Sequence, residues 1–425
     1  MLTFLNKKNF IFLIMCLEPF LKNIESVRVC KKFSDYFFKN STNCWENTDS
    51  ELNVTQIIRK WGFNAEEHYN RTEDGYEILI VRSYSKITRS TPIVIGHGIY
   101  MNSLAFVDTG KKSLTYILNK LGYDVWLINF RGTRYSSNHD NLTTNDTEYW
   151  KFSFHEMGVY DLRETLNVVF KVTRQKSIYI GYSMGSTISY VFASTYPEEA
   201  FQLLKGIISL APVAYLNNIK SVLRYGAPYW PMIKPPVQFI WKGKVLPRKK
   251  HTGKFCSKNP TKMYICEFIK VPIFGDDFDQ MDPLYRPVTN ILNPDTIGIN
   301  VVTHFDQIII SGKFQQMDHR KGNEVLYGTS TPPLYQLSNI NVPVSLFVGL
   351  NDWVATRKNA EQLCRELINT KCNIRYIDHK KWNHGDFVTA KDIKPLLNDP
   401  VGLEIYNIEL YWKEHVSQES MTNLL

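Results

Sequence analysis

A single serine lies between two glycines in the stretch YIGYSMGSTISY, residues 179–190. An apolar run precedes Ser183 and a helix-like run follows it, which is the strand, turn and helix context of a nucleophile elbow. Gly181 and Gly185 allow a sharp turn that leaves the serine hydroxyl exposed at the end of the strand. Since a serine hydroxyl is a poor nucleophile near neutral pH, it needs a base and a group that orients the base. The alternative is an ordinary serine in a helix-capping turn.

Candidates for the acid and the base follow two late apolar runs. Asp352 comes directly after VPVSLFVGLN, although an aspartate capping the next helix is the competing interpretation. The stretch IDHKKWNHGDF offers His379 and His384, and His384 is favoured because it lies in the loop beyond the predicted strand. The order Ser183, Asp352, His384 is the nucleophile, acid and base order of one large class of serine hydrolases.

The stretch IVIGHGIYMNS, residues 93–103, ends an early predicted strand in a glycine-containing loop. Acyl transfer through a tetrahedral intermediate needs NH donors aimed at the developing oxyanion. We expect the backbone NH groups of Ile99 and Met184 to be these donors, with His97 a hydrogen-bonded loop histidine and not a base. A plain tight turn is the alternative.

Short β-rich runs alternate with helix-like segments and predict an α/β fold with a mostly parallel sheet flanked by helices. Strands are expected at 76–84, 91–96, 123–129, 177–182, 204–211, 342–350 and 373–378, and helices near 111–121, 157–173, 184–196 and 357–368 and inside 398–416. The alternation stops after residue 212 and a Pro-rich, basic and aromatic region follows, which indicates an inserted cap. The predicted organisation is a signal peptide (1–26), an N-terminal segment packing on the core (27–75), core (76–212), cap or lid (213–310) and core (311–425).

The N-terminus indicates a secretory route. Two lysines precede an apolar stretch from Phe10 to Leu17 that is too short to span a bilayer, which is typical of a signal peptide cleaved near Ser26. An uncleaved anchor or a buried helix is the alternative. The formal charge of +9 is spread along the chain with only small clusters, so nucleic-acid binding is not indicated. After signal removal we expect no transmembrane segment, while the oligomeric state stays open.

Six cysteines remain when Cys16 leaves with the signal peptide, an even number that suits an oxidising compartment. Local spacing suggests three disulfides, although other pairings stay open and no pair has zinc-site spacing. Five N-glycosylation sequons fit the same compartment. The suggested pairs are Cys30 with Cys44, Cys256 with Cys266 and Cys364 with Cys372, and the sequons are at Asn40, Asn53, Asn70, Asn141 and Asn145.

Over roughly residues 52–416 the chain closely resembles the acid lipase family, which includes gastric and lysosomal acid lipases. The resemblance is carried by ordered motifs that include GHGIYMNS, GYDVWLINFRGTRYSS, FSFHEMGVYDLRETL, GYSMGS, TPPLYQLSNINVPV, GLNDWVA and WNHGDF. It implies an α/β-hydrolase fold with a movable lid, a disulfide between Cys256 and Cys266, and glycosylation. Position by position it implies Ser183 as nucleophile, Asp352 as acid, His384 as base, and Ile99 and Met184 as oxyanion donors.

The chain departs from the family pattern at two places near these residues. Tyr182 stands where histidine is usual, and NHGDF stands where NHLDF is common. Neither change alters a catalytic functional group, but both leave pH optimum and acyl-chain preference open. The cap is the least similar part, and its aromatics, Tyr229, Trp230, Phe239 and Trp241, either line an acyl groove or lid or form cap core.

The leading hypothesis is a secreted or lysosomal lipase that hydrolyses triacylglycerols or cholesteryl esters at a lipid–water interface, without metal or organic cofactor. An esterase or transacylase acting on other esters is the alternative within the enzyme class. Outside that class, a non-catalytic lipid-binding protein with the same fold is the alternative.

Overall fold

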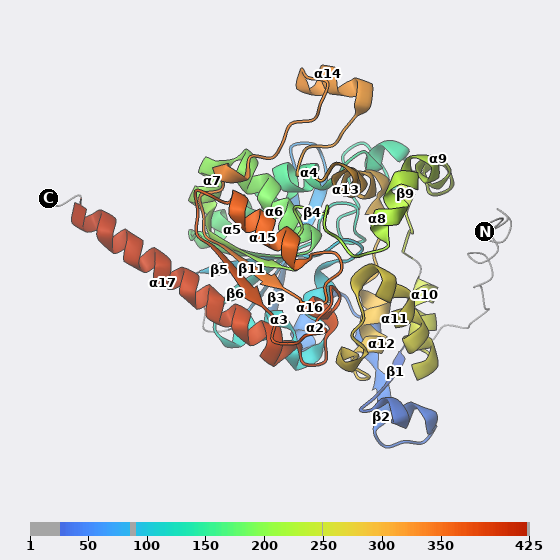
Figure 1. The fold of residues 1–425 in the computed structure, drawn as a ribbon. Coiled ribbons are helices and arrows are strands. Elements are labelled where there is room, and N and C mark those ends of the chain that lie inside the picture. Colours follow the sequence, from blue (N-terminus) through green and yellow to red (C-terminus); the bar gives the residue numbers. More distant parts are fainter. Residues whose placement is uncertain (1–25, 86–90, 249, 423–425) are drawn as a thin grey trace.

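The computed structural model describes residues 26–85, 91–248 and 250–422 (Figure 1). The predicted signal peptide therefore lies outside the described residues, apart from Ser26. A central sheet of eight strands has the order β12-β11-β8-β7-β5-β6-β4-β3. Its strands are β3 (Asn64–Arg71), β4 (Glu77–Tyr84), β5 (Pro92–Gly96), β6 (Asp124–Ile128), β7 (Ser177–Tyr182), β8 (Leu204–Leu210), β11 (Val344–Val348) and β12 (Cys372–Tyr376).

Six of these strands, from β12 to β6 in the sheet order, run parallel, while β4 pairs antiparallel with both β6 and β3. Every residue of β5, β6, β7 and β11 is buried, as expected for strands covered on both faces. Because the strands are parallel, their carboxyl ends meet at one edge of the sheet. The loops after β5, β7, β11 and β12 therefore converge there.

Helices cover both faces of the sheet, as Figure 1 shows. One face packs against α3 (Leu114–Lys120) and α17 (Asp399–Thr422), and the other against α5 (Arg163–Thr173) and α6 (Met184–Thr195). A π-helical turn, Met157–Leu162, leads into α5. The other helices around the sheet are α2 (Val54–Lys60), α4 (Phe154–Glu156), α7 (Pro197–Leu203), α15 (Arg357–Glu366) and α16 (Asp386–Thr389), while α14 (Asn323–Tyr327) projects away from the sheet (Figure 1).

The mostly parallel sheet predicted from the sequence is confirmed, but the strand β3 was missed. Its sequence, NAEEHYNR, consists mostly of charged and polar residues, and only Ala65 is buried. An edge strand needs few apolar side chains and is protected by charge. The segment predicted to pack on the core as residues 27–75 thus adds β3 to the sheet and forms a hairpin of β1 (Val27–Cys30) and β2 (Cys44–Asn47).

Between β8 and β11 no described residue joins the central sheet, which fits an inserted cap. This region is largely helical, although its sequence pattern predicts no helices. A small sheet pairs β9 (Lys244–Val245) with β10 (Ile297–Gly298). The helices are α8 (Leu223–Gly226), α9 (Trp230–Trp241), α10 (Lys250–Ser257), α11 (Pro260–Phe274), α12 (Arg286–Leu292) and α13 (Ile299–Ser311).

Three disulfides join the cysteines in the pairs that local spacing suggests. Cys30–Cys44 links β1 to β2, Cys256–Cys266 links α10 to α11, and Cys364–Cys372 links α15 to β12. Each therefore ties together two neighbouring elements, and the second holds two cap helices to each other.

A buried arginine fixes the loop after β6. Arg131 is fully buried and lies 2.6 Å from Asp161, whose carboxylate is also fully buried. A second carboxylate, on Asp74, accepts a hydrogen bond of 2.9 Å from the same guanidinium, and the Tyr76 ring lies 4.0 Å away. A buried charge needs such compensation because its own desolvation is costly.

We predict that Arg131→Met lowers the free energy of unfolding by about 3–5 kcal/mol, because it leaves the Asp161 carboxylate buried and unpaired. Chemical denaturation measures the change. Arg71→Met is the matched control, because Arg71 also contacts two carboxylates, on Glu77 and Asp140, but is 46% exposed. It should cost less than about 1 kcal/mol. Equal costs for both variants would contradict the assignment.

Candidate active site

Ser183 occupies a strained turn between β7 and α6. Its backbone has φ 51° and ψ −114°, a region that residues other than glycine rarely adopt. The turn is held by close backbone approaches: a Cβ added to Gly185 would lie 2.5 Å from the Gly96 carbonyl oxygen, and one added to Gly181 would lie 2.6 Å from the Gly185 carbonyl carbon. The Ser183 NH also donates to the Leu210 carbonyl at the end of β8, at 2.9 Å. This is the geometry of a nucleophile elbow.

The structure brings Ser183, His384 and Asp352 together. His384 Nε2 lies 2.8 Å from Ser183 Oγ, and His384 Nδ1 lies 2.8 Å from Asp352 Oδ2. An ionised carboxylate only accepts hydrogen bonds, so Nδ1 carries the proton and Nε2 is left to accept from the serine hydroxyl. The other oxygen of Asp352 accepts from the backbone NH groups of Val354 and Ala355, at 2.8 and 2.7 Å. These bonds fix the carboxylate.

The triad is covered, which corrects the expectation of an exposed serine. Ser183 is 5% exposed and His384 is 3% exposed. The end of cap helix α11 lies over this edge, with the Phe274 ring stacked on the His384 ring at 5.5 Å between centroids. The Phe274 carbonyl accepts from the His384 NH at 3.3 Å, and the Gly275 carbonyl accepts from the side chain of Asn383 at 3.1 Å. The cap thus contacts the loop that carries His384 directly.

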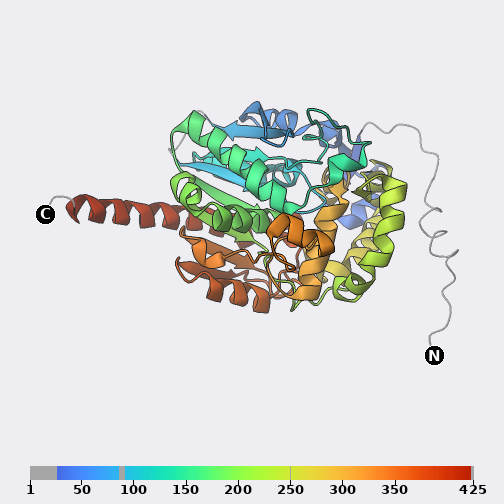
Figure 2. The same ribbon diagram turned by 90° about the horizontal axis from the view of Figure 1, so that it is seen from above.

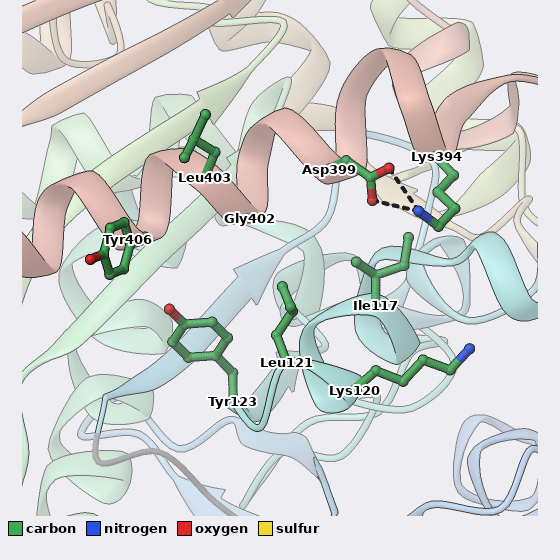
Figure 3. Close-up of a pocket in the computed structure, with 9 residues that line it drawn as sticks. All are labelled: Ile117, Lys120, Leu121, Tyr123, Lys394, Asp399, Gly402, Leu403 and Tyr406. Carbon is green, nitrogen blue, oxygen red and sulfur yellow. Dashed lines mark hydrogen bonds and ion pairs between the residues drawn. The ribbon is translucent and has the colours of Figure 1, made fainter.

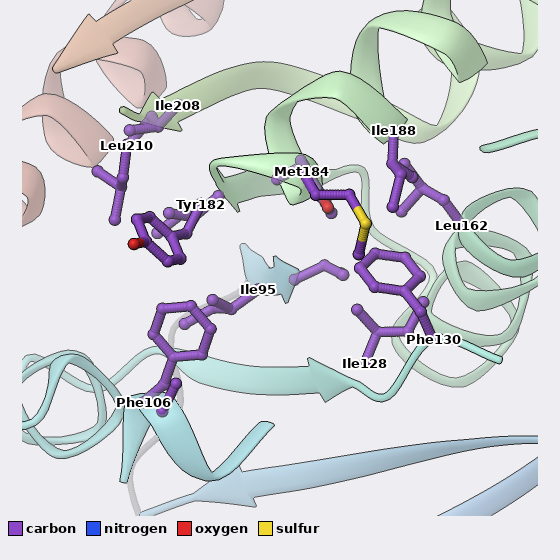
Figure 4. Packing of buried hydrophobic residues seen from close by; sticks show 14 of the residues in the cluster. Ile95, Phe106, Ile128, Phe130, Leu162, Tyr182, Met184, Ile188, Ile208 and Leu210 are labelled. Atoms are coloured by element: carbon purple, nitrogen blue, oxygen red, sulfur yellow. The ribbon is translucent and has the colours of Figure 1, made fainter. Parts of the chain in front are cut away.

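Tyr182, next to the serine, ties the elbow to the same loop. Its hydroxyl donates to the His384 carbonyl at 2.8 Å, and the two rings lie 5.5 Å apart. Figure 4 shows Tyr182 within the core that also contains Phe106 and Leu210. Burial raises the pKa of Tyr182 well above its ordinary value, so the phenol stays protonated and donates. The side chain by which the elbow departs from the family pattern therefore holds the His384 loop.

The loop after β5 lies against the elbow. A Cβ added to Gly98 would lie 2.8 Å from the Tyr182 ring and 3.4 Å from the Ser183 Cβ. His97 Nε2 accepts from the Phe130 NH at 3.1 Å, so its Nδ1 carries the proton donated to the Gly98 carbonyl at 2.9 Å. This bond orients the peptide that contains the Ile99 NH.

The environment of His97 keeps it neutral. Burial lowers its pKa to about 4, against the smaller opposite effect of its bond to Gly98. A neutral ring retains the Nε2 acceptor, and the loop then keeps its conformation in mildly acidic solution. His97 is thus a hydrogen-bonded loop histidine, apart from the Ser183, His384 and Asp352 set.

Met184 is the first residue of α6, where backbone NH groups have no partner within the helix. Within the described part of the chain, the NH groups of Ile99 and Met184 donate to no other group. Met184 follows Ser183 directly in the chain, and Ile99 follows Gly98, which lies against Ser183. These positions fit the expected oxyanion donors.

The other candidates from the sequence lie outside this set. His379 has its Nε2 2.7 Å from a carboxylate oxygen of Asp277, so it is not part of the Ser183, His384 and Asp352 set. Four sequon asparagines are exposed and Asn70, on β3, is half-buried. The four exposed ones are Asn40, Asn53, Asn141 and Asn145. Among the cap aromatics, Tyr229 and Phe239 are 61% and 87% exposed and so are not cap core.

A surface hollow of about 460 Å³ lies between α3 and α17 (Figure 3). Its lining is mostly apolar, with Leu121 and Leu403 facing it and the Lys394–Asp399 ion pair at one end. No residue of the Ser183 set lines it, so it is not where the described chemistry would occur. Over the described ranges, no group of three or more His, Cys, Asp or Glu side chains is placed to hold a metal ion.

Comparisons with known proteins agree with this geometry. Residues 91–235 match a family model described as alpha/beta hydrolase fold, and residues 54–110 match one described as partial alpha/beta-hydrolase lipase region. Lipase 1 of Drosophila melanogaster is 32% identical over 355 residues, which cover 82% of this chain and 78% of that protein. Human gastric triacylglycerol lipase is 31% identical over 374 residues, covering 83% and 90% of the two chains. The chain belongs to the acid lipase family.

Membership of the acid lipase family confirms the predicted α/β-hydrolase fold and makes this protein a carboxylic ester hydrolase of the serine type. Sequence reasoning missed two contacts of this acid lipase's site. Tyr182 stands out in the sequence because histidine is usual at this position in the family. The sequence does not show, however, that the Tyr182 hydroxyl donates to the His384 carbonyl. Nothing in the sequence signals that Phe274 stacks on His384, because the two lie 110 residues apart and only the folded cap brings them together.

We predict that Tyr182→Phe lowers kcat by about tenfold or more, because a buried carbonyl of the His384 loop loses its donor, at a cost of about 1–3 kcal/mol. Steady-state kinetics on a soluble ester, well below the melting temperature, give kcat and KM separately. Tyr36→Phe is the control: its buried hydroxyl donates to the backbone carbonyl of Pro283, away from the triad. It should cost similar stability and leave kcat unchanged. Equal kcat values for the two variants would contradict this role for Tyr182.

Proposed function

We propose that this protein hydrolyses ester bonds of neutral lipids, triacylglycerols or cholesteryl esters, through Ser183, His384 and Asp352. The observation that carries the proposal is the pair of 2.8 Å contacts that join the three side chains in order. The kinship with gastric triacylglycerol lipases supports the lipid ester as substrate.

In the first step His384 Nε2 takes the Ser183 proton as Oγ attacks the ester carbonyl carbon. Asp352 keeps the proton on Nδ1 and stabilises the imidazolium that forms. The carbonyl oxygen becomes an oxyanion, which the NH groups of Ile99 and Met184 stabilise. His384 then protonates the leaving alcohol as the ester bond breaks, and an acyl group remains on Ser183.

In the second step water replaces the alcohol. His384 takes a proton from the water as its oxygen attacks the acyl carbon, and the same two NH groups stabilise the second oxyanion. The bond to Ser183 Oγ breaks and the proton on Nε2 returns to Oγ. The fatty acid leaves, and the site is restored without any cofactor.

Substrate must reach a serine that is 5% exposed, so the cap has to move. We assign this movement to α9, which lies between anchored segments of the cap, since the end of α11 is bonded to the loops that carry His384 and Asp352. The Trp353 NH donates to Phe274, and the Asn351 side chain donates to Asp276. Helix α9, in contrast, has no buried residue.

We place the protein on the secretory route, either secreted or lysosomal. Three disulfides and exposed sequon asparagines suit an oxidising compartment. An esterase or transacylase on other esters would use the same triad, and a purely lipid-binding protein would not need it. A panel of emulsified triacylglycerol, cholesteryl ester and a short soluble ester, from acidic to neutral pH, separates these functions.

We predict that Ser183→Ala lowers kcat by about 10⁴-fold or more on every hydrolysed ester, because the nucleophile is lost. Ser189→Ala is the control, since Ser189 is a buried serine of α6, the helix that follows Ser183, and its hydroxyl donates to the Ser186 carbonyl. It should keep near wild-type kcat. Full activity of Ser183→Ala would overturn the triad, and no hydrolysis by the wild-type protein would favour the lipid-binding function.

A further inference from the structure

The excess positive charge of the protein is concentrated in one segment of the cap, which corrects the expectation that the charge is spread along the chain with only small clusters. Residues 213–275 contain twelve Lys and Arg residues and a single acidic residue, Glu267. The rest of the chain carries 38 Lys and Arg residues against 40 Asp and Glu. The excess of +9 over the whole chain therefore comes from this segment, which we call the basic cap. Such an asymmetry points to an anionic partner.

The one carboxylate of the basic cap does not neutralise its surface. Glu267 is 16% exposed and lies 3.2 Å from Lys270 and 3.5 Å from Arg286. Four cations of the basic cap are exposed and form no ion pair with a carboxylate among the residues that the structure describes, although the Lys242 charge acts at longer range on Asp146. The four cations are Lys220, Arg224, Lys242 and Lys258.

The helices of the basic cap also expose large apolar side chains. On α9, Met232 is 76% exposed and Phe239 is 87% exposed, and on α11, Phe268 is 67% exposed. Thirteen of the 29 large apolar side chains that are exposed in the described residues lie between 222 and 269. Exposed apolar area that is mixed with Lys and Arg is typical of elements that bind in the interface of a membrane.

This surface adjoins the candidate active site. The backbone NH groups of Lys220 and Ser221 donate to the carbonyl of Trp353, the residue after Asp352, at 2.8 and 3.1 Å. Val222, at the start of the exposed apolar run, donates to Pro272 of α11 at 2.9 Å. Figures 1 and 2 place α8 to α11 at one end of the molecule, opposite the projecting end of α17. No described helix is long and apolar enough to cross a bilayer.

We infer that the basic cap docks on an anionic lipid–water interface, with its exposed apolar side chains in the acyl region and its Lys and Arg residues at anionic headgroups. The inference deepens the proposed function and rests on it, because the ester that Ser183 attacks would come from that interface. Docking by this face brings the interface to the part of the cap that adjoins the triad.

The test measures partition of the processed Ser183→Ala protein, from which the predicted signal peptide has been removed, into vesicles by sedimentation, so that hydrolysis does not alter the lipid. The vesicles are phosphatidylcholine alone or a mixture of phosphatidylcholine and phosphatidylglycerol. We expect tighter binding to the mixture, weakened by salt because the attraction is screened. Each neutralised cation near the surface should weaken binding to the mixture by about fivefold.

The charge variant replaces Lys220, Arg224, Lys242 and Lys258 by Gln. Its matched control replaces four exposed lysines outside the cap by Gln, namely Lys120, Lys171, Lys358 and Lys371. The cap variant should lose the preference for phosphatidylglycerol, and the control should keep it. Equal binding of the two variants, or equal binding of the unaltered cap to both vesicles, would overturn the inference.

The apolar variant replaces Met232, Phe239 and Phe268 by Ser, and its control replaces the similarly exposed Val325, Leu326 and Ile368 by Ser. Only the cap variant should lose binding to both kinds of vesicle. All variants, with Ser183 restored, are also assayed on a short soluble ester, whose hydrolysis needs no docking. No hydrolysis by the wild-type protein would refute the proposed function, whereas soluble-ester hydrolysis without preferential vesicle binding would refute only the docking.

Discussion

The site depends on one strained residue. Ser183 has a backbone conformation that costs on the order of 1–3 kcal/mol, and surrounding packing has to compensate for it. The compensation comes from backbone approaching backbone, at Gly181 and Gly185, where any side chain would collide. The result is a hydroxyl that projects from the end of β7 while its carbonyl begins the hydrogen bonding of α6. A relaxed serine at this position would point elsewhere.

The remaining parts of the site are arranged around that hydroxyl by the parallel sheet. Three separate strand ends deliver the elbow, the Asp352 loop and the His384 loop to one edge, and short hydrogen bonds fix each loop. Asp352 is held by two backbone NH groups, His384 by its carbonyl bond from Tyr182, and the loop after β5 by His97. Thus each functional group is oriented by a neighbour that takes no part in the chemistry, as preorganised catalysis requires.

Much of this was predictable from the sequence because it depends on local patterns. Buried parallel strands have continuous apolar runs in the sequence. The elbow glycines, Gly181 and Gly185, lie within two residues of Ser183 on either side. Edge strand β3 was not predictable in this way, because charge and not apolarity suits its position. The contact of Phe274 with His384 was not predictable either, because it depends on how the cap folds onto the core. Helix α9 was missed because it contains Pro235 and Pro236, and proline inside a segment argues against a helix there.

In the proposed mechanism two backbone NH groups stabilise the oxyanion of the intermediate bound to Ser183, while His384 faces Ser183 Oγ. A crystal structure of the protein after reaction with an alkyl phosphonate ester can reveal this arrangement, because the tetrahedral phosphorus imitates the intermediate. We expect phosphorus bonded to Ser183 Oγ, with one phosphoryl oxygen about 2.7–3.1 Å from the NH groups of Ile99 and Met184. An adduct on another residue, or a phosphoryl oxygen directed away from both NH groups, would contradict this mechanism.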